Sequence, residues 1–86
     1  MKSPGYKGKR NIIAKRLIEA RKKAGLTQDD LAARLQVREV SIDQQTISKI
    51  ELNQRAVTDY EVAIICESLK ISPEWILGEI KERDEK

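Results

Sequence analysis

The chain has 86 residues and a formal net charge of +3; 40% of its residues are hydrophobic and 36% are charged. This length fits one small domain, and the apolar fraction is sufficient for a helical core. The sequence contains no histidine and a single cysteine. We therefore expect no metal site, no cofactor and no enzymatic activity. No apolar run approaches the roughly 18 residues of a membrane span, and no signal peptide is visible, so we expect a cytoplasmic protein.

The positive charge is concentrated at the N-terminus. Residues 1–24 carry nine Lys or Arg and one acid, a net +8, whereas residues 25–86 carry eight Lys or Arg and thirteen acids, a net −5. Such a cationic end favours nucleic acid as a partner, with an anionic membrane surface as the second choice. A solvated face with no partner would show the same charge run.

Residues 1–10 predict a flexible basic arm. They contain two Gly, one Pro and four basic residues, without apolar periodicity. Two interpretations remain open for this arm: it follows a DNA groove, or it is a disordered solubilising tail.

A first helix is predicted after the arm. Asn11 is a candidate for its N-cap, and Gly25 for its left-handed end. An apolar stripe at steps of four, three and four residues gives its buried face, made of Ile13, Leu17, Ala20 and Ala24.

A second helix of two to three turns is predicted from Thr27. The Thr27 hydroxyl and the Asp30 carboxylate, three residues apart, form a capping-box-like pair. Leu31, Ala32 and Leu35 supply its buried face.

The stretch from 36 to 42 carries no helix signal and is rich in β-branched residues. We expect Val37, Val40 and Ile42 to pack against the core because only apolar side chains gain from burial. Arg38 and Glu39 are expected to be exposed.

Asp43 is a candidate N-cap for a third helix with the sequence QQTISKIE. Ile47 and Ile50 lie three residues apart and are expected to face the core. The outer face is then left to Gln44, Gln45, Ser48 and Lys49.

Two further helices are predicted in the C-terminal half. The segment from Thr58 to Glu61 is a capping box, and Ser72 followed by Pro73 is a typical N-cap with proline in the first helical position. The apolar residues expected on the fourth helix are Val62, Ile65, Cys66 and Leu69. The apolar residues expected around the fifth are Trp75, Ile76 and Ile80.

Three segments, AGLTQDDLAARL, TISKIE and SLKISPEWIL, together resemble the Cro/lambda-repressor-like (XRE) family over about residues 12–78. The resemblance implies an all-α, compact five-helix domain in which the second and third helices form a helix-turn-helix. The third helix would lie in the DNA major groove. We expect this domain at residues 11–80, between the arm of residues 1–10 and a charged tail at residues 81–86.

The resemblance implies sequence-specific binding of double-stranded DNA by a prokaryotic or phage-type transcriptional regulator, with repression as the expected effect. Glutamine pairs with adenine and lysine with guanine in the major groove. The expected base-contacting residues are Gln44, Gln45, Lys49 and Ser48. Ordinary surface polar residues would give the same pattern.

Other roles also follow from the resemblance. The expected phosphate contacts are Thr27, Gln28, Thr46, Asn53 and Arg55. Arg21 and Glu51 are expected to form a structural ion pair between the first and third helices. The family commonly binds as a homodimer on two-fold operators, and the possible dimer surface is Trp75, Ile76 and Ile80; alternatively, Trp75 only closes the core.

One departure from the family is an insertion of about five residues, Arg38–Ile42, between the second and third helices. It leaves the angle between these helices open, and also whether Arg38 reaches DNA. Two other functions fit the same fold: an antitoxin that binds a toxin and represses its own operon, and a protein–protein adaptor without DNA binding.

Overall fold

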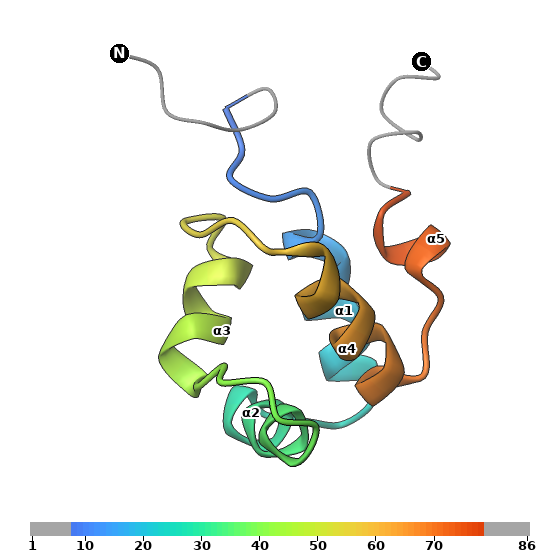
Figure 1. Cartoon of the computed structure of the whole chain (residues 1–86). Helices are drawn as coiled ribbons and strands as arrows, with labels where there is room; N and C mark the ends of the chain where they lie inside the picture. Colours follow the sequence, from blue (N-terminus) through green and yellow to red (C-terminus); the bar gives the residue numbers. More distant parts are fainter. Residues whose placement is uncertain (1–7, 79–86) are drawn as a thin grey trace.

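The computed structural model describes residues 8–78 of the chain, and within this range the regular structure consists of helices, without strands. In chain order the helices are α1 (Ala14–Lys23), α2 (Gln28–Val37), α3 (Gln44–Glu51), α4 (Asp59–Leu69) and α5 (Pro73–Ile76). Helix α3 packs against α1 and α2, and α4 packs against α2 and α5 (Figure 1). The expected all-α, five-helix fold is confirmed. Most of the predicted arm and all of the predicted tail lie outside the described residues.

The core is built from aliphatic side chains of every helix and of the turn before α3. Its largest fully buried members are Ile13, Leu17, Leu31, Leu35, Ile42, Ile47, Ile50, Ile65 and Ile76. Burial of each such side chain contributes about 1.5–3 kcal/mol before the entropy of ordering is subtracted. The inward faces predicted for the second, third and fourth helices are confirmed, and Cys66 is one of the buried residues.

Two residues expected in the core are exposed. Ala24 lies at the C-cap of α1, where the chain leaves the core. Val37 is 80% exposed because α2 continues to this residue. Two helical steps of 100° after Leu35 place Val37 on the opposite face of α2.

Four helices begin at the predicted cap residues. Thr27, Asp43, Thr58 and Ser72 each accept a hydrogen bond from the backbone N–H three residues later. Thr27 and Thr58 also complete reciprocal capping boxes with Asp30 and Glu61. In addition, Pro73 occupies the first turn of α5 as predicted.

Helix α1 begins differently from the prediction. Its N-cap is Ile13, which has no capping side chain, and the helix starts at Ala14. Asn11 lies two residues before that cap, and its Oδ1 accepts a hydrogen bond from the Ile13 N–H (3.0 Å). The expected N-cap position of Asn11 is therefore wrong: its buried side-chain amide donates to the carbonyl oxygens of Ile50 in the last turn of α3 and of Arg55 in the loop that follows.

The four longer helices end in the same way. In each, a residue with positive φ donates its N–H to the carbonyl three residues before, and the next N–H bonds the carbonyl five residues before. The left-handed residues are Gly25 (φ 75°), Glu39 (φ 63°), Asn53 (φ 62°) and Lys70 (φ 57°). Gly25 was predicted in this role; the other three carry a Cβ in a conformation that favours glycine.

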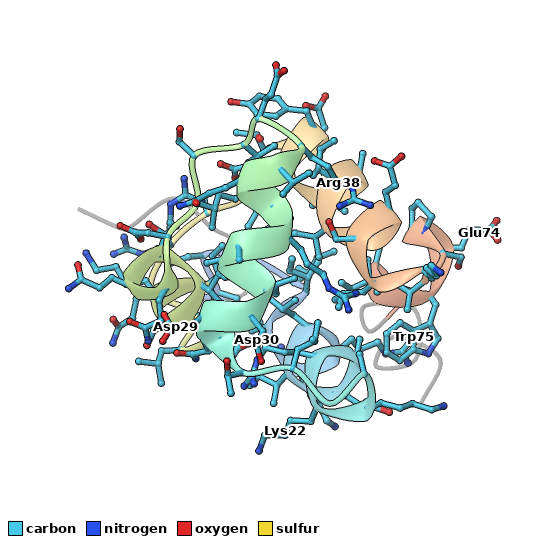
Figure 2. The ribbon with its side chains drawn as sticks, turned by 90° about the horizontal axis from the view of Figure 1, so that it is seen from below. Lys22, Asp29, Asp30, Arg38, Glu74 and Trp75 are labelled. Atoms are coloured by element: carbon cyan, nitrogen blue, oxygen red, sulfur yellow. The ribbon has the colours of Figure 1, made fainter. Side chains whose placement is uncertain are left out.

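The insertion between α2 and α3 is an ordered turn. Ile42 is fully buried and Val40 is half-buried against the core, as predicted, while Arg38 and Glu39 are exposed. Arg38 points toward α4, where its Nε lies 3.4 Å from a carboxylate oxygen of Glu67 (Figure 2). The apolar side chains of the turn therefore fix α3 against α2.

The left-handed conformation of Glu39 predicts that glycine is preferred at this position. We expect Glu39→Gly to stabilise the fold by about 0.5–1 kcal/mol, because relief of the Cβ strain outweighs the greater entropy of the unfolded chain. Glu39→Ala is the matched control, since it removes the same side chain but keeps the Cβ, and it should change stability by about 0.5 kcal/mol or less. Urea unfolding measures both, and a glycine variant no more stable than the alanine variant would contradict the prediction.

Candidate nucleic-acid interface

The outer face of α3 carries polar side chains only. Gln45 and Lys49 are exposed, and Gln44 and Ser48 are half-buried. The opposite face is anchored in the core by two isoleucines. All four residues predicted to contact bases therefore lie on one side of α3, within about 140° of each other around the helix axis.

A bidentate ion pair joins α1 to the end of α3. Arg21 Nε lies 2.7 Å from Glu51 Oε2, and Arg21 Nη2 lies 3.1 Å from Oε1. The two side chains are only 10% and 6% exposed. Arg21 Nη1 also donates to the carbonyl oxygen of Leu26 (2.8 Å), so the same guanidinium holds the turn that leads into α2. The hydrogen bond to Glu51 raises the pKa of Arg21, so the guanidinium stays charged.

This ion pair continues into the candidate interface through two glutamines. Gln28 Nε2 donates to Glu51 Oε1 (2.9 Å), and Gln44 Nε2 donates to Gln28 Oε1 (2.6 Å). These hydrogen bonds join four side chains in series, Arg21, Glu51, Gln28 and Gln44. The series links α1, α3 and α2, and ends at the first residue of α3.

The charge of Glu51 fixes the direction of every bond in this chain. An ionised carboxylate only accepts, so Gln28 must turn its NH₂ group toward Glu51 and its oxygen toward Gln44. Gln44 must then give one N–H to Gln28, which leaves its oxygen and its second N–H for another partner. One acceptor and one donor side by side are what adenine N6 and N7 require.

The start of α2 carries two of the residues predicted to contact phosphate, Thr27 and Gln28. The Thr27 hydroxyl accepts the N–H of Asp30 (3.0 Å). Figure 2 shows Asp29 and Asp30 at this same end of α2, with Asp29 on the side of α3, where it lines a hollow together with Gln44 and Gln45. The hydrogen bond that the Thr27 backbone N–H donates to the Asp30 carboxylate lowers the pKa of Asp30. The two acids complement the helix dipole, but they also place negative charge near the expected phosphates.

The structure gives Arg55 a partner that sequence reasoning missed. Its Nη1 and Nη2 each lie 3.1 Å from an oxygen of Glu61, whose side chain is 7% exposed. Burial alone would raise the pKa of Glu61, but hydrogen bonds from Arg55 and Thr58 outweigh it and lower that pKa. The capping box identified Glu61, but no local pattern pairs it with Arg55.

Asn53, another predicted phosphate contact, is also bonded within the chain. Its Oδ1 accepts the backbone N–H groups of Arg10 (2.8 Å) and Asn11 (3.1 Å). Thr46, the remaining candidate, is half-buried on α3, and its backbone N–H donates to Asp43 (2.8 Å).

The expected dimer surface needs a correction at Ile76. This side chain is fully buried in the core of its own chain, because α5 docks its apolar face on α4, so Ile76 offers no exposed surface. Trp75 is half-buried, with the guanidinium carbon of Arg16 5.0 Å from its ring centroid, and Arg16 also bonds the Trp75 carbonyl oxygen. Ile80 lies outside the described residues.

Among residues 8–78 there is no group of three or more Cys, Asp or Glu side chains arranged to hold a metal ion. None of the helices in this range is long and apolar enough to cross a membrane.

Helices α2 and α3 pack against each other and are joined by a turn. The outer face of α3 is polar, and its first residue, Gln44, is bonded to Gln28 in the first turn of α2. This is the arrangement of a helix-turn-helix, in which the second helix is the one that enters the DNA major groove. A protein-family model described as helix-turn-helix matches residues 17–76, and the chain belongs to this family, the Cro/lambda-repressor-like (XRE) helix-turn-helix proteins. The match runs from the middle of α1 to the end of α5. The family consists of DNA-binding regulators of transcription. A search of curated proteins found no significant match.

The buried Arg21–Glu51 pair predicts a large difference between two Glu→Gln substitutions. Glu51→Gln leaves the Arg21 charge buried without its counter-charge, and we expect a loss of about 3 kcal/mol in unfolding free energy. Glu67→Gln removes the carboxylate of an exposed ion pair on α4 and should cost no more than about 0.5 kcal/mol. Chemical denaturation of both variants is the measurement; equal losses would show that the Arg21–Glu51 pair is not specially stabilising.

The lowered pKa of Glu61 predicts an acid-dependent loss of stability. A carboxyl group with a lowered folded pKa stabilises the fold above its unfolded value of about 4.3, and this stability is lost as pH falls through the folded pKa. Glu61→Gln removes the titrating group, so unfolding free energy measured between about pH 5 and 3 should fall less steeply than in the wild type. Parallel pH profiles would contradict the prediction.

Proposed function

We propose that this chain binds double-stranded DNA sequence-specifically as a prokaryotic or phage-type transcriptional repressor. Membership of the helix-turn-helix family supports the DNA-binding part of this proposal. The observation that supports sequence specificity is the hydrogen bond that Gln44 donates to Gln28 Oε1, because it orients the Gln44 amide before any DNA is bound.

In the proposed complex α3 lies in the major groove. Gln44 bonds an adenine with its oxygen and its second N–H, which its contact with Gln28 leaves unoccupied. Gln45 and Lys49, both exposed on the same face, contact neighbouring bases, and lysine suits guanine O6 and N7. Ser48, half-buried on the same face, completes the proposed base-contacting set.

The phosphates on each side of the groove position the domain without specifying sequence. Gln28 has a second N–H that its bond to Glu51 does not use, and it lies at the start of α2, where the helix dipole favours an anion. Thr27 and Thr46 are proposed to contact phosphates through their hydroxyl groups. Arg55 is proposed to contact phosphate through the part of its guanidinium that faces away from Glu61.

The proposed mechanism is binding without catalysis, in the cytoplasm where the DNA lies. Two copies would occupy a two-fold operator with half-sites about 34–36 Å apart, or a multiple of that distance. The candidates for the contact between copies are the half-buried Trp75 of α5 and the exposed Leu77 at the end of that helix.

Selection of bound duplexes from a random pool tests the proposal directly. A single enriched motif with two-fold symmetry is the expected result. Enrichment of no sequence would contradict sequence-specific binding and favour an adaptor, while co-purification with a small partner protein would favour an antitoxin.

Replacement of the two glutamines tests their role in specificity. We expect Gln44→Ala and Gln45→Ala each to weaken binding to the selected site by about 1–3 kcal/mol, because each removes contacts to a base edge. The same variants on a scrambled duplex are the control, and there the affinity should barely change. Equal losses on both duplexes, measured by titration at one salt concentration, would remove these residues from the base-contacting set.

A further inference from the structure

Two asparagine side chains tie the arm to the end of α3. Asn53 Oδ1 accepts the backbone N–H groups of Arg10 (2.8 Å) and Asn11 (3.1 Å). In return, Asn11 Nδ2 donates to the carbonyl oxygens of Ile50 (3.0 Å) and Arg55 (2.9 Å). Asn11 is only 6% exposed. The chain before α1 therefore has a fixed position beside the loop that follows α3 (Figure 1).

The residue type at position 53 points to a function for its side chain. Asn53 is left-handed at φ 62°, a conformation that glycine adopts at the lowest cost. Glycine would satisfy the helix end but would provide no acceptor for the N–H groups of Arg10 and Asn11. Asparagine satisfies both requirements, because it tolerates positive φ better than most residues and carries a carbonyl oxygen.

The N-terminal segment that ends at Arg10 is strongly cationic in sequence. Residues 1–10 contain Lys2, Lys7, Lys9 and Arg10 and no acid. Lys9 lines a surface hollow of about 420 Å³ between the arm and α4 and another of about 300 Å³ beside α3, the second shared with Lys15, Leu52 and Asn53. The arm thus joins the domain next to the C-terminal end of α3, the helix proposed to enter the major groove.

We propose that Asn53 is a positioning residue for the arm, and this inference rests on the proposed DNA binding. Asn53 fixes the place where Lys9 and Arg10 leave the domain, so that their side chains meet the phosphates flanking the bases contacted by α3. Asn53 thus acts through the arm and not through its own contact with a phosphate. A fixed starting point lowers the conformational entropy that the arm loses when it binds.

A double-mutant cycle tests this coupling. The four proteins are the wild type, Asn53→Gly, a variant with Lys2, Lys7, Lys9 and Arg10 all replaced by Gln, and the combination of both changes. Asn53→Gly removes the acceptor and keeps the left-handed helix end. Affinity for the selected duplex is measured at several salt concentrations, together with the thermal midpoint of each protein.

We expect the effect of Asn53→Gly on DNA binding to depend strongly on whether the arm carries its four positive charges. With the native arm, Asn53→Gly should weaken binding roughly three- to tenfold and reduce the slope of log K against log salt by about 0.9–1.8, the share of one or two phosphates. With the neutral arm, the same substitution should change neither quantity noticeably. An equal loss in both backgrounds would overturn the inference, and would be the result if Asn53 contacts a phosphate itself or only supports the fold.

Hydrogen exchange tests the anchor without DNA. The Arg10 and Asn11 amides should exchange slowly in the wild type and faster in Asn53→Gly, and Asn53→Asp, which keeps an acceptor, should restore protection. Unchanged protection in the glycine variant would also overturn the inference. A wild type that binds no duplex would overturn the proposed function and this inference with it, whereas normal wild-type binding with an additive cycle overturns this inference alone.

Discussion

The bidentate bond between Arg21 and Glu51 is the interaction on which the arrangement of the site depends. Removing two charges from water is costly, so both side chains must be fully satisfied within the fold. Arg21 achieves this through Glu51 and the Leu26 carbonyl oxygen, which fixes α1, α3 and the turn before α2 relative to one another. The remaining capacity of Glu51 then dictates which way Gln28 and Gln44 turn their amides. A structural ion pair thereby determines which groups the half-buried Gln44 amide, at the other end of the network, has left to donate and accept hydrogen bonds.

The parts of the fold that could be predicted from the sequence are those decided within about four residues. The caps at Thr27 and Thr58 require only a hydroxyl and an acid three positions apart, and the buried faces follow from the spacing of apolar residues. The family resemblance added one long-range contact, between Arg21 and Glu51. In the candidate site, sequence reasoning gave the residue types on the outer face of α3 but not the bonds that orient them.

The features that the sequence did not predict depend on which of several apolar side chains the core takes up, or on hydrogen-bond partners that are distant in the sequence. Val37 was expected to be buried because it is apolar, but continuation of α2 turned it outward. An apolar residue on a short helix suits a core or an interface equally well, and only the packed structure places Ile76 inside. Asn11 bonds a carbonyl oxygen 39 residues further along the chain, and Arg55 pairs with a glutamate six residues further along. No periodicity of the sequence predicts such pairs.

The position of Trp75 has a spectroscopic consequence. It is the only tryptophan of the chain, it is half-buried, and the Arg16 guanidinium lies over its ring. Figure 2 shows it on the far side of α2 from α3. Its fluorescence therefore reports on the packing of α5 against α1, and is not affected directly by groups that approach α3. The native chain thus carries an internal optical probe that separates events at its C-terminal end from events at the polar face of α3.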